Sequence, residues 1–181
     1  MKQQQIAKHR KQQDLVSIRR GEIDSNFIQA FILDSSEELV ALQYVYDFNL
    51  DGLMFLRIQD ITEVKNSTTD KFQKGLLEKE GLLRQVQFGA AFELSNWASL
   101  IPQLAKEYEL MILERELIED GDLFIGTVLK VTKTEVQGRY FSGAAKWAET
   151  PEKLKCKDIT SCQVGTNYVN VYQRHFRQRA L

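Results

Sequence analysis

Three aspartates in the first half of the chain, Asp47, Asp51 and Asp60, form its best acidic cluster. Two neighbouring carboxylates can share acid and base roles in catalysis. Asp47 and Asp51, however, flank a short stretch rich in Asp, Asn and Gly, where aspartate is favoured because its side chain bonds turn backbone. The sequence also contains no Gly-rich phosphate loop, nucleophile-elbow serine or His-rich metal motif. We therefore expect a protein that is not an enzyme and that uses no cofactor or metal.

The two cysteines, Cys156 and Cys162, lie on either side of an Asp-Ile-Thr triplet. If this region is a strand that turns into another strand, both thiols are expected to be small core residues rather than a disulfide. With only two histidines, His9 and His175, no metal-ligand spacing appears.

Aromatic and basic residues on predicted strands suggest a nucleic-acid hypothesis. Small barrels bind single-stranded chains by stacking bases on aromatic rings and by holding phosphates with Arg or Lys. The candidates are Tyr44, Tyr46 and Arg57 in the first half of the chain and Arg139, Tyr140 and Lys155 in the second. Tyrosines that alternate along a strand are also ordinary half-buried sheet residues. Binding of RNA or single-stranded nucleic acid is therefore the alternative function.

The charges are unevenly distributed although the net charge is only −1. Residues 1–20 sum to +5 and residues 172–181 to +3, which leaves −9 on the residues between them. Basic ends can hold nucleic acid, dock onto the acidic body of a neighbouring subunit, or remain solvated. An acidic body is a poor general surface for phosphates, and solvated ends are the leading interpretation of this charge pattern. Oppositely charged ends and body are also consistent with the expected protein partner or self-association.

Length and composition indicate a folded chain outside the membrane. With 181 residues, 43% of them apolar, the chain can build one or two ordinary cores. No apolar run approaches the roughly 20 residues that cross a bilayer, and residues 1–10 lack the apolar stretch of a secretion signal. We expect a soluble cytoplasmic protein without a membrane partner.

The elements that must position these residues occur twice. Gly21 opens a run of apolar segments that closes on Asp60-Ile61-Thr62, and Gly121 opens a similar run that closes on Asp158-Ile159-Thr160. The two spacings are nearly equal, which indicates an internal repeat of about 100 residues.

In the first copy, β-branched and aromatic residues predict strands over 27–33, 39–46 and 53–58, with a hairpin turn over 47–52. Both alternations of these segments are apolar, so we expect the sheet to be covered on both faces. The triplet should interrupt the run by capping backbone, and residues 63–65 resume it as a last strand. A helix begins near residue 68 and ends at Gly81. Residues 1–20 are interpreted as a frayed helix or a flexible lead-in.

Between the copies, the pattern predicts a strand over 82–88, a helix from about residue 95 with Pro102 near its first turn, and a strand over 110–113. The second copy has predicted strands over 123–131, 136–141 and 154–156. A terminal helix follows, in which Tyr168, Tyr172 and Phe176 share one face.

Each copy, with its glycine and acidic residue, two long strands, a turn, a shorter strand and Asp-Ile-Thr, resembles a small Sm-like or SH3-like β-barrel. The tandem arrangement resembles uncharacterised bacterial proteins that pair two such barrels. The resemblance covers about 45 residues of each half. The resemblance implies a fold. Proteins of the Sm-like class commonly form rings that bind RNA, and transferring this function to the present chain is an analogy based on fold alone.

These observations predict a mainly β (α+β) chain with two tandem small barrels, a strand-helix-strand insertion and short packing helices. The expected parts are a polar basic segment (1–20), a first barrel with its helix (21–80), a connection (81–117) and a second barrel with a C-terminal helix (118–181). The expected function is a non-enzymatic binding or protein-interaction module, with RNA or single-stranded nucleic-acid binding as the alternative.

Overall fold

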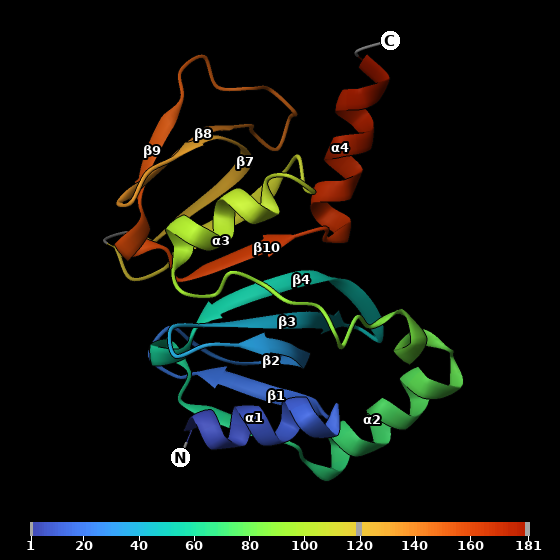
Figure 1. Ribbon diagram of the computed structural model, residues 1–181. Helices are drawn as coiled ribbons and strands as arrows, with labels where there is room; N and C mark the ends of the chain where they lie inside the picture. Colours follow the sequence, from blue (N-terminus) through green and yellow to red (C-terminus); the bar gives the residue numbers. More distant parts are fainter. Residues whose placement is uncertain (1, 119–120, 180–181) are drawn as a thin grey trace. The chain divides into compact units, whose positions relative to one another are not determined.

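The computed structural model describes residues 2–118 and 121–179, and the chain divides into two compact units, Met1–Ser95 and Asn96–Leu181 (Figure 1). Residues 1, 119–120 and 180–181 belong to the predicted N-terminal segment and to the predicted second barrel with its basic end, and they lie outside the described residues. Strands predominate in the described part of both units, and their pairings within each unit are antiparallel, which confirms a mainly β chain with packing helices.

The first unit is an open five-stranded sheet in the order β5-β1-β2-β3-β4. Its elements are α1 (Lys2–Gln12), β1 (Leu15–Arg20), β2 (Asp24–Ser35), β3 (Leu39–Tyr46), β4 (Asn49–Arg57), the 3₁₀ turn η1 (Ile58–Asp60), β5 (Glu63–Lys65), α2 (Thr68–Lys79) and η2 (Leu82–Gln85). The helix α1 lies beside the sheet (Figure 1) and contributes Ile6 to its core.

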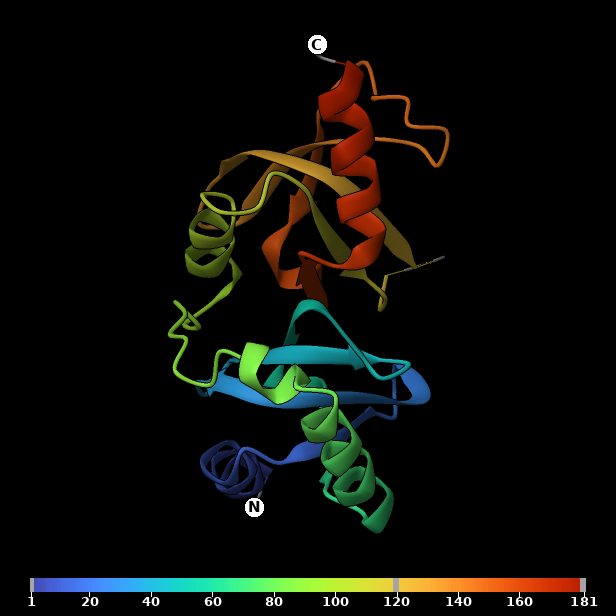
Figure 2. The same ribbon diagram turned by 90° about the vertical axis from the view of Figure 1, so that its right-hand side faces the viewer.

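The second unit is an open five-stranded sheet in the order β10-β6-β7-β8-β9. Its elements are α3 (Trp97–Leu104), β6 (Met111–Arg115), β7 (Asp122–Val131), β8 (Glu135–Tyr140), β9 (Glu152–Lys155), η3 (Cys156–Asp158), β10 (Ser161–Val164) and α4 (Asn167–Arg179). Figure 2 shows α4 lying along this sheet, where Tyr172 and Phe176 pack on Phe141.

Apart from η2, which follows the last helix of the first unit, the two units contain the same elements in the same order. A leading helix precedes four strands, a 3₁₀ turn, a fifth strand that pairs with the first, and a closing helix. The closing helices also begin alike, because the Ser67 hydroxyl accepts from Asp70 N and the Thr166 hydroxyl accepts from Val169 N. The chain thus contains two units with the same arrangement of helices and strands.

The interpretation of residues 1–20 as a frayed helix or flexible lead-in is wrong for residues 15–20, whereas residues 2–12 form the helix α1. Residues 15–20 form β1, which lies between β5 and β2, and Leu15, Val16 and Ile18 are fully buried. Leu15 and Val16 point to opposite faces of a sheet that is covered on both sides. Apolar and polar residues therefore do not alternate at these positions, and the sequence lacks the usual signal of a strand.

The predicted strand over 82–88 is also wrong. Residues 82–85 form η2, and residues 86–95 contain no strand. They form an irregular segment across the outer face of the first sheet, with Phe88 against Phe31 and Phe92 against Phe55 at centroid distances of 5.6 and 5.2 Å. The segment is apolar because it covers a sheet face and not because it joins a sheet.

Pro102 lies in the second turn of α3, not near the first as predicted. The helix has only eight residues, so the missing N–H of Pro102 removes one internal hydrogen bond. The strand predicted at 110–113 corresponds to β6, which pairs with β7 and β10 and is the first strand of the second unit.

The core of the first unit is built by all five strands. One apolar cluster takes inward residues from each of them: Val16, Ile18, Ala30, Ile32, Val40, Leu42, Met54, Leu56 and Val64, together with Ile61 of the triplet. The intervening residues Phe31 and Phe55 are also fully buried, on the opposite face. The expected burial of both faces is therefore present in β2, β3 and β4.

Candidate functional site

The threonines of the two Asp-Ile-Thr triplets make matching contacts. Thr62 N and Oγ1 donate to Arg19 O at 2.8 and 3.1 Å, and Thr160 N and Oγ1 donate to Glu114 O at 2.8 and 3.0 Å. Each threonine oxygen also accepts from the backbone two residues further along the first strand of its unit, from Gly21 N and Glu116 N respectively. The isoleucines Ile61 and Ile159 are both fully buried. The triplets are structural equivalents.

The glycines that suggested the start of each copy are not equivalent. Gly21 occupies the position of Glu116, since both donate to the triplet threonine. Gly121 lies later, immediately before β7, and has a φ of 53°, a conformation that favours glycine. The repeat thus begins one strand earlier than its glycines indicated, at β1 and at β6.

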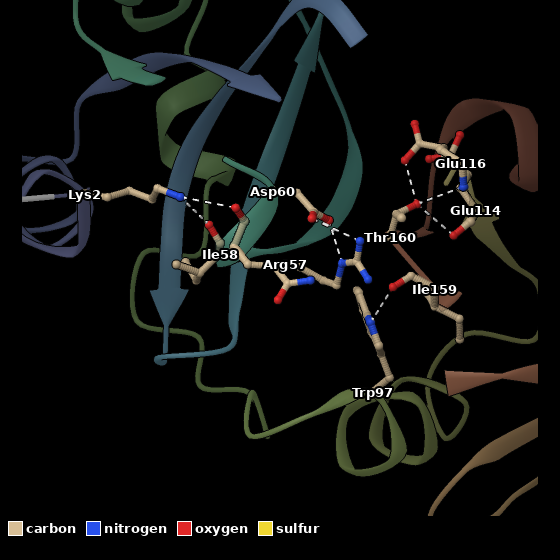
Figure 3. Close-up of polar contacts among 10 residues, drawn as sticks. Lys2, Arg57, Ile58, Asp60, Trp97, Glu114, Glu116, Ile159 and Thr160 are labelled. Carbon is tan, nitrogen blue, oxygen red and sulfur yellow. Dashed lines mark hydrogen bonds and ion pairs between the residues drawn. The ribbon is translucent and has the colours of Figure 1, made fainter. Parts of the chain in front are cut away.

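The aspartate of the first triplet binds a side chain and not the backbone that the triplet was expected to cap. Asp60 binds Arg57 through two contacts, Nε to Oδ2 at 2.5 Å and Nη2 to Oδ1 at 3.0 Å, and both side chains are nearly buried (Figure 3). Backbone carbonyls beside the triplets are instead bound by the leading helices. Lys2 Nζ donates to Ile58 O at 2.9 Å, and Trp97 Nε1 donates to Ile159 O at 2.8 Å (Figure 3).

The hairpins between the second and third strands show which residues of the two units are equivalent. Ser36 and Thr132 each donate a backbone N–H across the turn, to Leu39 O at 2.9 Å and to Glu135 O at 2.8 Å. Each hairpin has a register shift at the same distance before the turn, between Ile32 and Asp34 and between residues 128 and 130. A shared bulge is a specific feature of a strand pair, so the positions can be compared one by one.

In the first unit, the outer face at these positions is covered and carries Ala41, Phe55 and Asp34. Ala41 pairs with both Asp34 and Phe55, and Ala41 and Phe55 are fully buried. The covering segment contributes Phe92, whose ring packs on Phe55 and whose N–H donates to Asp34 Oδ2 at 3.1 Å. This face is part of the fold.

In the second unit, the equivalent face is open and basic. Gln137 pairs with both Lys130 and Lys153, in the positions of Ala41, Asp34 and Phe55. Lys155 lies two residues after Lys153 and pairs with Glu135. Paired residues share a face and side chains alternate along a strand, so these side chains point to the same side. The opposite side carries Val136 and Leu154, which are fully buried.

We name this surface the lysine face; it comprises Lys130, Thr132, Glu135, Gln137, Arg139, Lys153 and Lys155. It contains a hollow of about 90 Å³. Lys130, Lys153 and Lys155 are exposed, and an ion pair within the face joins Lys153 to Glu135 at a long 4.0 Å. Such an exposed, extended pair neutralises little charge, so the face is positively charged and can bind an anionic ligand.

The structure brings two of the six predicted binding residues onto this face. Arg139 follows Gln137 by two residues and donates Nε to Ala148 O at 2.8 Å, and Lys155 lies at its edge. Tyr140 points to the other side of β8. Lys130 and Lys153 were not predicted, because the strand register that brings them together is not visible in the sequence.

The candidates in the first unit do not form one site. Tyr44 packs against the core, and Tyr46 beside it is 63% exposed. Arg57 is at the opposite end of β4, because Tyr46 pairs with Asn49 whereas Arg57 pairs with Leu39. Its guanidinium is occupied by Asp60.

The acidic cluster considered for catalysis is separated in the same way. Asp47 is in the hairpin turn after β3 and Asp51 is in β4, whereas Asp60 lies beyond the other end of β4. Among the described residues, no group of three or more His, Cys, Asp or Glu side chains is arranged to hold a metal ion.

The two cysteines differ in burial. Cys162 lies in the interior of the second unit, in the position of Val64, while Cys156 at the start of η3 is half-buried. Burial raises the pKa of both thiols above the usual range. Both are therefore protonated at neutral pH and are poor nucleophiles.

Comparison with protein-family models, with curated proteins and with solved structures found no match to this chain. In the described part of the chain, no helix has the length and apolar character needed to cross a membrane.

Proposed function

We propose that the protein is a non-enzymatic binding module made of two small Sm-like or SH3-like barrels, and that its lysine face binds the phosphate backbone of single-stranded RNA. The barrel reading is supported by the element order in each unit. A 3₁₀ turn separates the fourth and fifth strands, the fifth strand pairs with the first, and in the first unit all five strands contribute to one core. A sheet that curls around a core in this way approaches a closed barrel.

The observation that carries the RNA proposal is the contrast between equivalent faces. The positions of Asp34 and Phe55, which are covered in the first unit, carry Lys130 and Lys153 in the second, where both side chains are exposed. Exposed lysines on an open sheet face do not stabilise the core of the unit. A row of such cations does attract a polyanion. Because the rest of the chain is acidic, this concentration of positive charge on one sheet face is local.

The chemistry of the face determines the kind of binding. Lysine is a point charge that binds phosphate without the fixed fork of arginine, and the lysine face contains no aromatic ring on which a base could stack. Binding is therefore expected to be weakly dependent on sequence and strongly dependent on salt. With three or four phosphate contacts on a single strand, the slope of log K against log salt should be about −2 to −3.

The test replaces three face lysines by glutamine, Lys130→Gln, Lys153→Gln and Lys155→Gln, and measures binding of a fluorescent single-stranded RNA at several salt concentrations. We expect the affinity to fall at least about tenfold at low salt and the slope to become about 2 smaller in magnitude. The matched control removes three exposed lysines of the first unit, Lys11→Gln, Lys71→Gln and Lys79→Gln. Equal losses in both variants, or no binding by the wild type, would contradict the proposal and favour a protein partner.

A further inference from the structure

An apolar groove with an acidic rim lies in the first unit, between the β3–β4 hairpin and the end of α2. It has a volume of about 520 Å³. Its lining consists of Asp47, Phe48, Asn49, Leu76, Glu80 and Leu82. Three of these side chains are large and apolar, two are carboxylates, and none is a cation. The groove therefore presents an apolar floor between negative charges.

The hairpin that forms one wall pays a conformational cost. Tyr46 pairs with Asn49, so the loop has two residues, and both have positive φ angles, 46° at Asp47 and 61° at Phe48. Two-residue hairpin loops favour Asn-Gly or Asp-Gly for this conformation, and a bulky residue such as phenylalanine is an outlier there. Phe48 also remains 45% exposed. The fold gains little from this ring, which points to a role in binding.

Further apolar surface continues from the groove along α2. Phe72 lies one helical turn before Leu76, on the same face of α2, and is 67% exposed. Exposed apolar surface that is contiguous and rimmed by polar groups is typical of a protein-binding site. An occupant must carry apolar side chains together with positive charge.

The chain itself contains such a segment in α4. Tyr168 lies at the edge of the aromatic core, against Tyr172, and is 47% exposed; Val171 and Arg174 follow at intervals of three residues on the exposed side of α4. Residues three apart are neighbours on a helix surface, so this stripe runs from apolar to cationic. Its chemistry is complementary to that of the groove, and the described part of α4 contains no acidic residue.

We propose that the protein self-associates head to tail, with α4 of one copy docked in the groove of a second copy. Tyr168 and Val171 contact Phe48 and Leu76, and Arg174 lies near Asp47 and Glu80. This interface is heterologous, because the two partners use different surfaces. Each copy therefore offers one free groove and one free helix, and the assembly grows with concentration until it closes. The inference does not depend on RNA binding.

A charge-swap experiment on the full chain tests the pairing. Glu80→Lys places a cation in the groove and Arg174→Glu places a carboxylate on the helix, so each variant should repel its own copies. Sedimentation equilibrium should show a concentration-dependent mass for the wild type and at least about tenfold weaker association for each variant. Because the paired charges are exposed, added salt should reduce this difference. A mixture of the two variants restores both complementary pairs, and its mass should return toward the wild-type value.

A second variant separates docking from folding. Phe48→Asn removes the ring but suits the positive φ, because asparagine tolerates this conformation. It should keep or raise the thermal midpoint and lose association. Glu37→Lys, an exposed carboxylate at the other end of the sheet, is the matched control and should associate like the wild type. The proposal is overturned by a monomeric wild type at all concentrations, by a mixture that stays as weak as its components, or by unchanged association of Phe48→Asn.

Discussion

The threonines of the two triplets make similar contacts but differ in burial. We expect this difference to determine how much each hydroxyl contributes to the free energy of unfolding. Thr160 is fully buried, and its single hydroxyl proton can be donated either to Glu114 O or to Glu116 Oε2 at 2.6 Å, whereas Thr62 is exposed. A buried polar group that loses its partner carries the full cost of desolvation, while an exposed one can bind water.

Replacing each threonine by valine keeps the shape and removes the hydroxyl. We expect Thr160→Val to lower the free energy of unfolding by about 1–3 kcal/mol, because the polar partners of the hydroxyl lose a buried hydrogen bond. Thr62→Val should cost less, about 0.5–1 kcal/mol, because water can replace the lost contacts. Urea unfolding of both variants measures the difference. Equal midpoint shifts would show that burial does not set the weight of these contacts.

At the scale of elements, α2 is tied to the first sheet through one carboxylate. Asp70 is 1% exposed and accepts from Ser67 N at 2.7 Å, Ser67 Oγ at 2.6 Å, Ser17 Oγ at 2.7 Å and Gln29 Nε2 at 3.2 Å. Burial alone would raise the pKa of Asp70, but these hydrogen bonds outweigh it and hold the pKa below its usual value. The helix cap and the helix–strand contact share this one charged group.

The pH dependence of stability tests this link. Because the folded-state pKa is depressed, the contribution of Asp70 is complete above the unfolded pKa of about 3.9 and is lost as the pH falls through the folded value. Asp70→Asn should therefore cost about 1–3 kcal/mol at neutral pH. The gap between variant and wild type should shrink as the pH falls below about 4. A gap that stays constant down to pH 2 would contradict the role of the ionised form.

The elements that were predicted correctly are those with clear local signals in the sequence. β3 and the β7–β8 hairpin combine apolar runs with turn residues, and α2 has polar capping residues at its start and Gly81 after its end, so these elements were predicted correctly. β1 lacks such signals, because it follows a polar helix and is buried on both faces. The lysine face could not be predicted, since Lys130 and Lys153 lie more than twenty residues apart and only the register of β8 brings them together.

The burial of β1 also changes how the basic N-terminus can be studied. Of its cations, Lys2 binds the Ile58 carbonyl, Arg10 binds Asp34 at 2.9 Å, and Arg20 is 5% exposed. These charges act within the first unit. Deleting residues 1–20 would remove a central strand and its core residues, so single charge substitutions are the appropriate way to separate the charge of this segment from its structural role.

At the scale of the whole molecule, the two units share a pattern of core residues and differ on one face. Val40 and Val136, and Leu56 and Leu154, are equivalent pairs, and all four side chains are fully buried. Phe55 and Lys153 occupy equivalent positions on the other face, one buried under Phe92 and one exposed. A single plan thus provides a covered, structural face in one copy and an open, charged face in the other.

Exchanging these two residues should therefore have opposite effects in the two copies. Phe55→Lys buries an unpaired charge and should lower the free energy of unfolding by several kcal/mol, or prevent folding of the first unit. Lys153→Phe changes an exposed site and should alter stability by less than about 0.5 kcal/mol while weakening RNA binding at low salt. Urea unfolding and RNA titration of the same two variants provide both measurements. Tolerance of lysine at position 55 would mean that the two faces do not differ as described, because a covered face cannot accept an unpaired charge without a large loss of stability.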